Sequence, residues 1–116
     1  MTQIEKIARL IGDEVESVTD QGVWLIEHGK PLNRDNEHPI RLFNPHTKKS
    51  DLMDVECALG IDVLHDEEYI TAEYWQHGLL EFDDKKRIAN YAHNKFTARS
   101  HAVCAVAEQI YDKGQV

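Results

Sequence analysis

The stretch ITAEYWQHGLLEF, residues 70–82, decides the fold class because it has the pattern of two β-strands joined by a tight turn. Residues 70–76 alternate between two kinds of side chain, which is typical of a strand with one face on a core. The dipeptide His77-Gly78 follows as a turn signal, and residues 79–82 are again mostly apolar. The stretch therefore predicts an antiparallel hairpin that is solvated on one side.

A first helix is expected upstream of this hairpin, over residues 3–17. Thr2 and Glu5 have the spacing of a capping box, in which the threonine hydroxyl accepts a hydrogen bond from the glutamate amide. Apolar residues then recur at helical spacing up to Val18, and acidic residues take the opposite side. These signals predict an amphipathic N-terminal helix.

A middle helix is expected to begin at Thr47 or Ser50, either of which can cap it, and to end at Leu59. Gly60 stands where a helix terminator belongs. A C-terminal helix is expected over residues 98–112. Its alanines would let this last helix lie close against a sheet.

The C-terminal helix is expected to begin with Thr97 or Ser100 as its cap. The preceding segment, residues 85–96, fits either a helix or a third strand of the hairpin sheet, and both alternatives stay open. Short strands are predicted at Val23–Ile26 and at residues 61–64.

A long loop is expected over residues 29–47, which hold all three prolines of the chain. Long loops in small domains often carry function, so this loop is a candidate contact region. Taken together, residues 1–116 are predicted to form one α+β domain. It would have a small antiparallel sheet of about three to four strands, with the N-terminal, middle and C-terminal helices packed on it.

The composition indicates a soluble domain, since 41% of the 116 residues are apolar and 29% are charged. The longest apolar run, Val23–Ile26, is too short to cross a bilayer, so no membrane association is expected. The N-terminus lacks the pattern of a signal peptide. Two cysteines are too few for a disulfide framework or a structural zinc site. We therefore expect a cytoplasmic protein with reduced thiols.

The charges are strongly segregated along the chain, which has 21 acidic and 13 basic residues and a net charge of −8. Residues 61–84 hold eight acids and no base, whereas six bases and two acids follow from residue 85 onward. An acidic surface of this kind favours association with a basic partner. The alternative is a solvated hairpin that the following basic segment partly neutralises.

The candidate partner-binding residues are the acids of this segment and two aromatic residues among them. Trp75 would be exposed if it shares a face with Thr71 and Glu73, and an exposed aromatic is typical of a protein-binding hot spot. The full candidate set is Asp62, Asp66, Glu67, Glu68, Tyr69, Glu73, Trp75, Glu81, Asp83 and Asp84.

No catalytic or cofactor motif was found, so we expect a protein that is not an enzyme and has no cofactor. The seven histidines lack metal-ligand spacing, the serines and cysteines lack a nucleophile context, and the six glycines never cluster into a phosphate-binding loop. Lys85-Lys86-Arg87 lies close to Tyr91 and Phe96, a mixture that suits nucleic acid. The acidic pI of about 5.3 argues against direct nucleic-acid binding.

Two stretches resemble small phage and prophage proteins of the ABA-sandwich kind. One is the loop Phe43–Thr47 that leads into the helix at residues 50–55, and the other is the closing helix at residues 96–107. The resemblance implies an α/β/α layered domain of phage origin. Such a protein would be located in the cytoplasm of the host bacterium. Small acidic phage proteins include inhibitors of host defence, among them anti-CRISPR proteins, some of which act as DNA mimics.

The leading functional hypothesis is accordingly a phage or prophage accessory protein that binds and inhibits a host protein. The target would be a basic, nucleic-acid-handling defence complex, met by the acidic surface. The alternative is a small-ligand sponge that holds an anionic nucleotide through histidines and Arg87 or Arg99. That protein could be a homodimer with the pocket between its subunits.

Overall fold

The computed structural model describes residues 1–114 and confirms an α+β fold with N-terminal, middle and C-terminal helices. Within these residues the strands form two separate three-stranded antiparallel sheets, in the orders β1-β2-β3 and β4-β5-β6. The expected single sheet is therefore two. In chain order the elements are α1 (Gln3–Leu10), β1 (Glu14–Thr19), β2 (Gly22–Ile26), β3 (Ile40–Phe43), α2 (Lys49–Leu59), β4 (Asp62–His65), β5 (Tyr69–Gln76), β6 (Leu79–Arg87), the 3-10 turn η1 (Ile88–Tyr91) and α3 (Lys95–Gly114).

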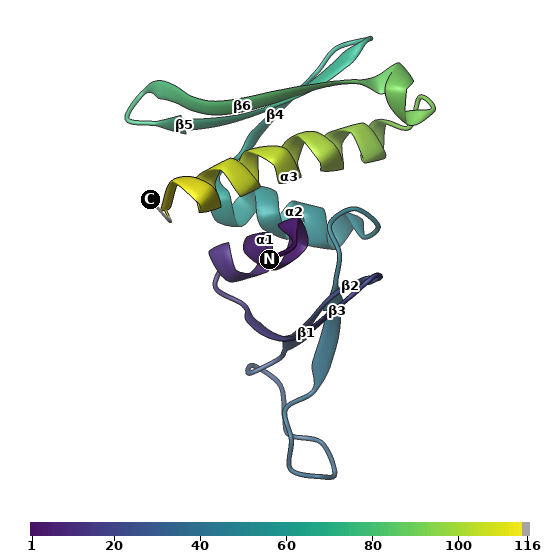
Figure 1. The fold of residues 1–116 in the computed structure, drawn as a ribbon, viewed down its shortest axis with the longest axis vertical. Coiled ribbons are helices and arrows are strands. Elements are labelled where there is room, and N and C mark those ends of the chain that lie inside the picture. Colours follow the sequence, from purple (N-terminus) through teal and green to yellow (C-terminus); the bar gives the residue numbers. More distant parts are fainter. Residues whose placement is uncertain (115–116) are drawn as a thin grey trace.

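The helices lie between the two sheets, which occupy opposite ends of an elongated molecule of 50 × 34 × 22 Å (Figure 1). Helix α3 packs against β5 and β6 on one side and against α1 and α2 on the other. Helix α1 also covers β1 and β2. The layers therefore run sheet, helices, sheet, which differs from the α/β/α order that the phage resemblance implies.

Helix α3 is the centre of the core, and its buried side chains are small. Ala98, Ala102, Val103, Val106 and Ala107 are fully buried. Small side chains let the helix approach β5 and β6 closely, as the sequence suggested. The larger core residues come from the elements on either side of it, among them Ile7, Val23, Phe43, Leu52, Val55 and Ile70.

The first helix is shorter than its sequence pattern suggested. Thr2 caps it as expected, its Oγ1 accepting from the Glu5 amide at 3.2 Å, but the helix ends at Leu10. Gly12 then takes a φ of +92°, which breaks the helix. Residues 11–13 connect it to strand β1, so residues 11–17 were assigned wrongly. Val15 and Val18 stand three residues apart, which is a helical spacing, and in strand β1 the register shifts between Val15 and Ser17.

The middle of the chain is partly as expected. Helix α2 ends at Leu59, and Gly60 terminates it with a φ of +66°. Neither Thr47 nor Ser50 caps it, because Lys48 occupies the cap position. The expected loop at residues 29–47 contains strand β3, which pairs with β2.

Residues 85–96 are neither a continuous helix nor a continuous strand. The first three residues complete β6, the turn η1 follows, and α3 already begins at Lys95. The cap of α3 is Asn94, whose Oδ1 accepts from the Thr97 amide at 3.1 Å. Thr97 and Ser100 therefore lie inside the helix.

The loop between β3 and α2 links the β1-β2-β3 sheet to helix α3. Ser100 on α3 is fully buried, and its Oγ lies 3.0 Å from the Pro45 carbonyl oxygen and 2.7 Å from His46 Nδ1. On the other ring nitrogen, His46 Nε2 lies 3.2 Å from Gln3 Oε1. Ser100 Oγ donates to the Pro45 carbonyl, and the His46 ring bridges Ser100 and Gln3, which links α3, the β3–α2 loop and α1.

Gly22 is the position where backbone geometry leaves no room for a side chain. Its φ is +139°, and a Cβ there would lie 2.5 Å from the Phe43 carbonyl oxygen. Gly22→Ala should therefore lower the free energy of unfolding by about 2 kcal/mol or more. Urea denaturation measures this, with Gly29→Ala as the control because a Cβ there meets nothing within 4 Å. Equal effects of both variants would contradict the assignment.

His46 predicts how stability depends on pH. Burial lowers the pKa of His46, and the neighbouring His101 lowers it further. The unfolded chain thus binds protons more readily than the folded one, so stability is fully present above a pH of about 6.5 and falls as the pH drops below it. Urea midpoints at different pH values test this. His46→Gln should flatten the dependence, whereas His77→Asn, in the exposed β5–β6 turn, should not.

Candidate functional site

Strand alternation divides the acidic segment 61–84 among three places. Asp62, Glu73 and Asp83 come together on the outer face of the β4-β5-β6 sheet, where Glu73 pairs in register with Asp62 on one side and with Asp83 on the other. Among residues 1–114 these three carboxylates form no ion pair. They make a row of like charges across three strands.

Two candidate acids point toward helix α3 instead of the outer face. Glu81, at the bulge of β6, forms an ion pair with Lys113 on α3. Asp84 Oδ2 lies 3.1 Å from Lys86 Nζ on the same side of the strand. Both carboxylates are less than a quarter exposed; Glu81 joins β6 to α3, whereas Asp84 pairs within β6. Glu81 and Asp84 therefore lie apart from the candidate acids of the outer face.

The acids of the β4–β5 turn lie at the end of the sheet away from the β5–β6 turn. Asp66 Oδ1 accepts from the amides of Glu68 and Tyr69 at 2.8 and 2.6 Å. These bonds favour the ionised form and lower the pKa of Asp66. Asp66 therefore holds the turn together, while Glu67 and Glu68 are exposed.

An apolar patch borders the row of carboxylates. Trp75 and Leu80 are neighbours across β5 and β6 and are 45% and 42% exposed. Trp75 Nε1 donates to Glu73 Oε1 at 3.3 Å, so the indole lies on the same face as the carboxylate row. We call the surface formed by Asp62, Glu73, Asp83, Trp75 and Leu80 the acidic face.

Basic and aromatic residues occupy the other end of the outer face. Lys85 Nζ lies 4.3 Å from the centre of the Tyr69 ring, and Arg87 is the register partner of Tyr69. Lys86 points to the opposite side and pairs with the inner acid Asp84. Lys85 and Arg87, in contrast, lie on the outer face and form no ion pair with Asp62, Glu73 or Asp83 among residues 1–114. Tyr69, a candidate contact, lies outside that face.

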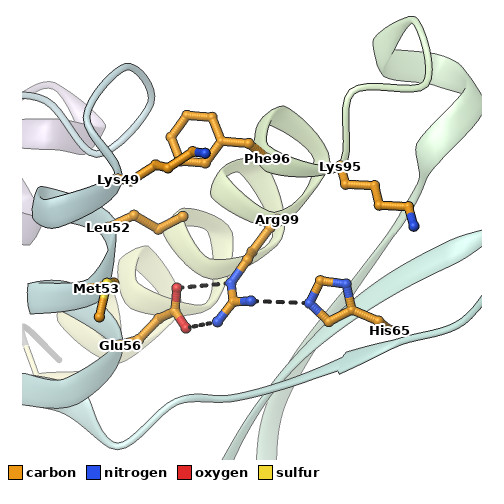
Figure 2. A pocket seen from close by; sticks show the side chains of 8 residues that line it. All are labelled: Lys49, Leu52, Met53, Glu56, His65, Lys95, Phe96 and Arg99. Atoms are coloured by element: carbon orange, nitrogen blue, oxygen red, sulfur yellow. Dashed lines mark hydrogen bonds and ion pairs between the residues drawn. The ribbon is translucent and has the colours of Figure 1, made fainter.

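A second candidate site is a pocket of about 350 Å³ between α2, α3 and the end of β4 (Figure 2). Its centre is Arg99, whose Nε donates to Glu56 Oε2 at 3.1 Å and whose Nη1 donates to His65 Nε2 at 3.1 Å. A further bond joins Nη2 to Glu56 Oε1. The ion pair raises the pKa of Arg99. The complete lining is Lys49, Leu52, Met53, Glu56, His65, Lys95, Phe96 and Arg99.

Sequence reasoning found only part of this pocket. Arg99 was a candidate ligand-binding residue, whereas Arg87 lies on the outer face of β6 and does not line the pocket. Lys95 and Arg99 stand four residues apart, which places them on one side of α3. No local signal joined them to Lys49 or His65, because only the packing of α2 on α3 brings these residues together.

Two nucleophilic side chains of helix α3, Ser100 and Cys104, are buried in the core. Ser100 and His46 are the closest nucleophile–base pair, but Ser100 is fully buried and no substrate can reach it. Burial raises the pKa of Cys104 to about 12, which keeps its thiol protonated. Within residues 1–114 no three potential ligands gather around a metal position. No helix in that range is long and apolar enough to cross a membrane.

Comparisons with protein-family models, curated proteins and solved structures find no match to this chain. The two candidate sites therefore rest on their own geometry.

The carboxylate row should cost the fold stability, because like charges directly opposite one another repel. Glu73→Gln removes the central charge and keeps the oxygen that accepts from Trp75. It should raise the free energy of unfolding by about 0.5 kcal/mol at low salt, and less at high salt because of screening. Chemical denaturation at two ionic strengths measures this. Glu37→Gln, in the exposed β2–β3 loop, is the control for net charge; an equal gain there would show that the row has no special cost.

Proposed function

We propose that this protein is a non-enzymatic binding protein whose acidic face docks on a basic surface of a partner protein. The observation that carries the proposal is the uncompensated row of Asp62, Glu73 and Asp83 on an exposed sheet. Such a row weakens the folded chain by itself. A cationic partner would turn this repulsion into attraction.

The neighbouring apolar pair supplies the second part of a docking surface. Trp75 and Leu80 are both more than two-fifths exposed and lie side by side one register pair from the β5–β6 turn. Adjacent exposed apolar side chains often mark an interaction site. Aromatic residues at the centre of an interface contribute a large share of binding energy, and charged residues around them set orientation and encounter rate. The acidic face combines both in adjacent register positions.

The chemistry of the partner follows from this arrangement. A row of carboxylates across neighbouring strands is complementary to clustered lysines and arginines, which proteins use to hold the phosphates of nucleic acid. If the partner uses that surface for nucleic acid, docking would compete with it. In this proposal the chain is a phage accessory protein of the anti-CRISPR type. It inhibits a host complex that handles nucleic acid by occupying the surface that the nucleic acid needs.

A capture experiment with three tagged baits tests the proposal in nuclease-treated bacterial lysate. The baits are the wild-type chain, a face variant and a control variant with the same change in charge. The face variant carries Asp62→Asn, Glu73→Gln and Asp83→Asn, and the control variant carries Asp20→Asn, Asp35→Asn and Glu37→Gln, all at exposed positions of the other half of the molecule.

A stoichiometric basic protein should remain on the wild-type and control baits and be lost from the face variant. Loss of three charge contacts should weaken binding by about 100-fold or more. Mass spectrometry identifies the protein, and competition with nucleic acid tests whether it uses the same surface. Capture of the same proteins by all three baits would sink the proposal. Circular dichroism of each bait checks that it is folded.

A further inference from the structure

The pocket between α2 and α3 has an excess of positive charge in a chain whose net charge is −8. Lys49, Lys95 and Arg99 line it, against the single carboxylate of Glu56. That carboxylate is already bound to the Arg99 guanidinium. Among residues 1–114 neither Lys49 nor Lys95 forms an ion pair, so no acidic side chain neutralises their charges.

The position of these lysines makes their charge more costly. Lys49 is the first residue of α2 and Lys95 is the first residue of α3. Cations at helix N-termini are unfavourable because the backbone amides already give that end a partial positive charge. Two such lysines beside one pocket create a positive potential that an anion would relieve.

The rest of the pocket is apolar and suits the body of an organic molecule. Leu52 is buried, Phe96 is partly buried, and Met53 is 61% exposed at the rim. The volume of about 350 Å³ lies within the range of about 300–1,000 Å³ in which proteins hold small ligands. Figure 2 shows these side chains around Arg99, which Glu56 and His65 hold in place.

We propose that this pocket binds a small organic anion, with a phosphate or carboxylate group on a flat apolar body. The positive potential of Lys49 and Lys95 attracts the anionic group, and the body lies against Phe96 and Met53. Glu56 and His65 hold the Arg99 guanidinium at the pocket. The site is distinct from the acidic face and does not depend on the protein-binding function proposed above.

Calorimetric titration with defined probes tests this proposal. Adenosine 5′-monophosphate combines a phosphate with a flat body, and 2-naphthoate combines a carboxylate with one. Adenosine and inorganic phosphate each lack one of the two parts. At least one complete probe should bind with a Kd of about 1 mM or tighter, and about tenfold more tightly than either partial probe. The better complete probe identifies the anionic group.

Three variants assign the binding to the pocket. Lys95→Gln should weaken the complete probe about tenfold, whereas Lys85→Gln, the same change on the outer face of β6, should leave it unchanged. Glu56→Gln should instead tighten binding, because it removes the one carboxylate that lines the pocket and so makes the potential there more positive. Binding is measured only on variants whose circular dichroism matches that of the wild-type chain.

Two results would overturn the proposal. One is the absence of binding by both complete probes at about 5 mM. The other is an equal loss of affinity for the complete probe in the Lys95→Gln and Lys85→Gln variants. That result would mean that binding depends on overall charge and not on this pocket. Since neither variant alters the acidic face as defined here, these outcomes leave the partner-capture experiment unaffected.

Discussion

Burial of helix α3 from both sides is the constraint on which the rest of the structure depends. Each three-stranded sheet is too small to bury its apolar face alone, and the two sheets lie at opposite ends of the molecule. Helix α3 therefore has to present an apolar surface to β5 and β6 and another to α1 and α2. Small residues such as Ala98, Ala102 and Ala107 make this possible because they let the neighbouring layers come close on both sides.

The same constraint decides which charges remain available for binding. Side chains of β6 that face α3 find partners there, as Glu81 does with Lys113. Side chains on the outer face have no helix above them, so Asp62 and Asp83 are exposed and Glu73 is half-buried between them. The acidic segment is thus divided between two sides of the sheet. Glu81 and Asp84 form ion pairs on the inner side, and Asp62, Glu73 and Asp83 form the candidate interface.

Much of the fold could be predicted from local signals, and the failures occur where tertiary pairing decides. The hairpin at residues 70–82 and the end of α2 at Gly60 follow from alternation and turn chemistry. The first helix was extended too far because Val15 and Val18 of β1 stand at helical spacing, and the bulge between Val15 and Ser17 forms only through pairing with β2. Strand β3 was missed because its four residues become a strand only through pairing with β2.

The candidate sites show the same division between local and tertiary information. Alternation along β5 correctly placed Trp75 beside Glu73, yet the bulge in β6 that turns Glu81 inward has no sequence signature. Register was needed to put Asp62, Glu73 and Asp83 in one row.

The pocket required still more information, since it forms only where α2, α3 and β4 meet. The Glu56–Arg99 ion pair joins α2 to α3 there and also keeps a guanidinium at the pocket wall. A contact that fixes helix packing thereby also fixes the charge of the site. That dual role explains why a cationic pocket can persist in an acidic protein: Arg99 is held by Glu56 whether or not an anion is bound, and only the lysines are left to respond to a ligand.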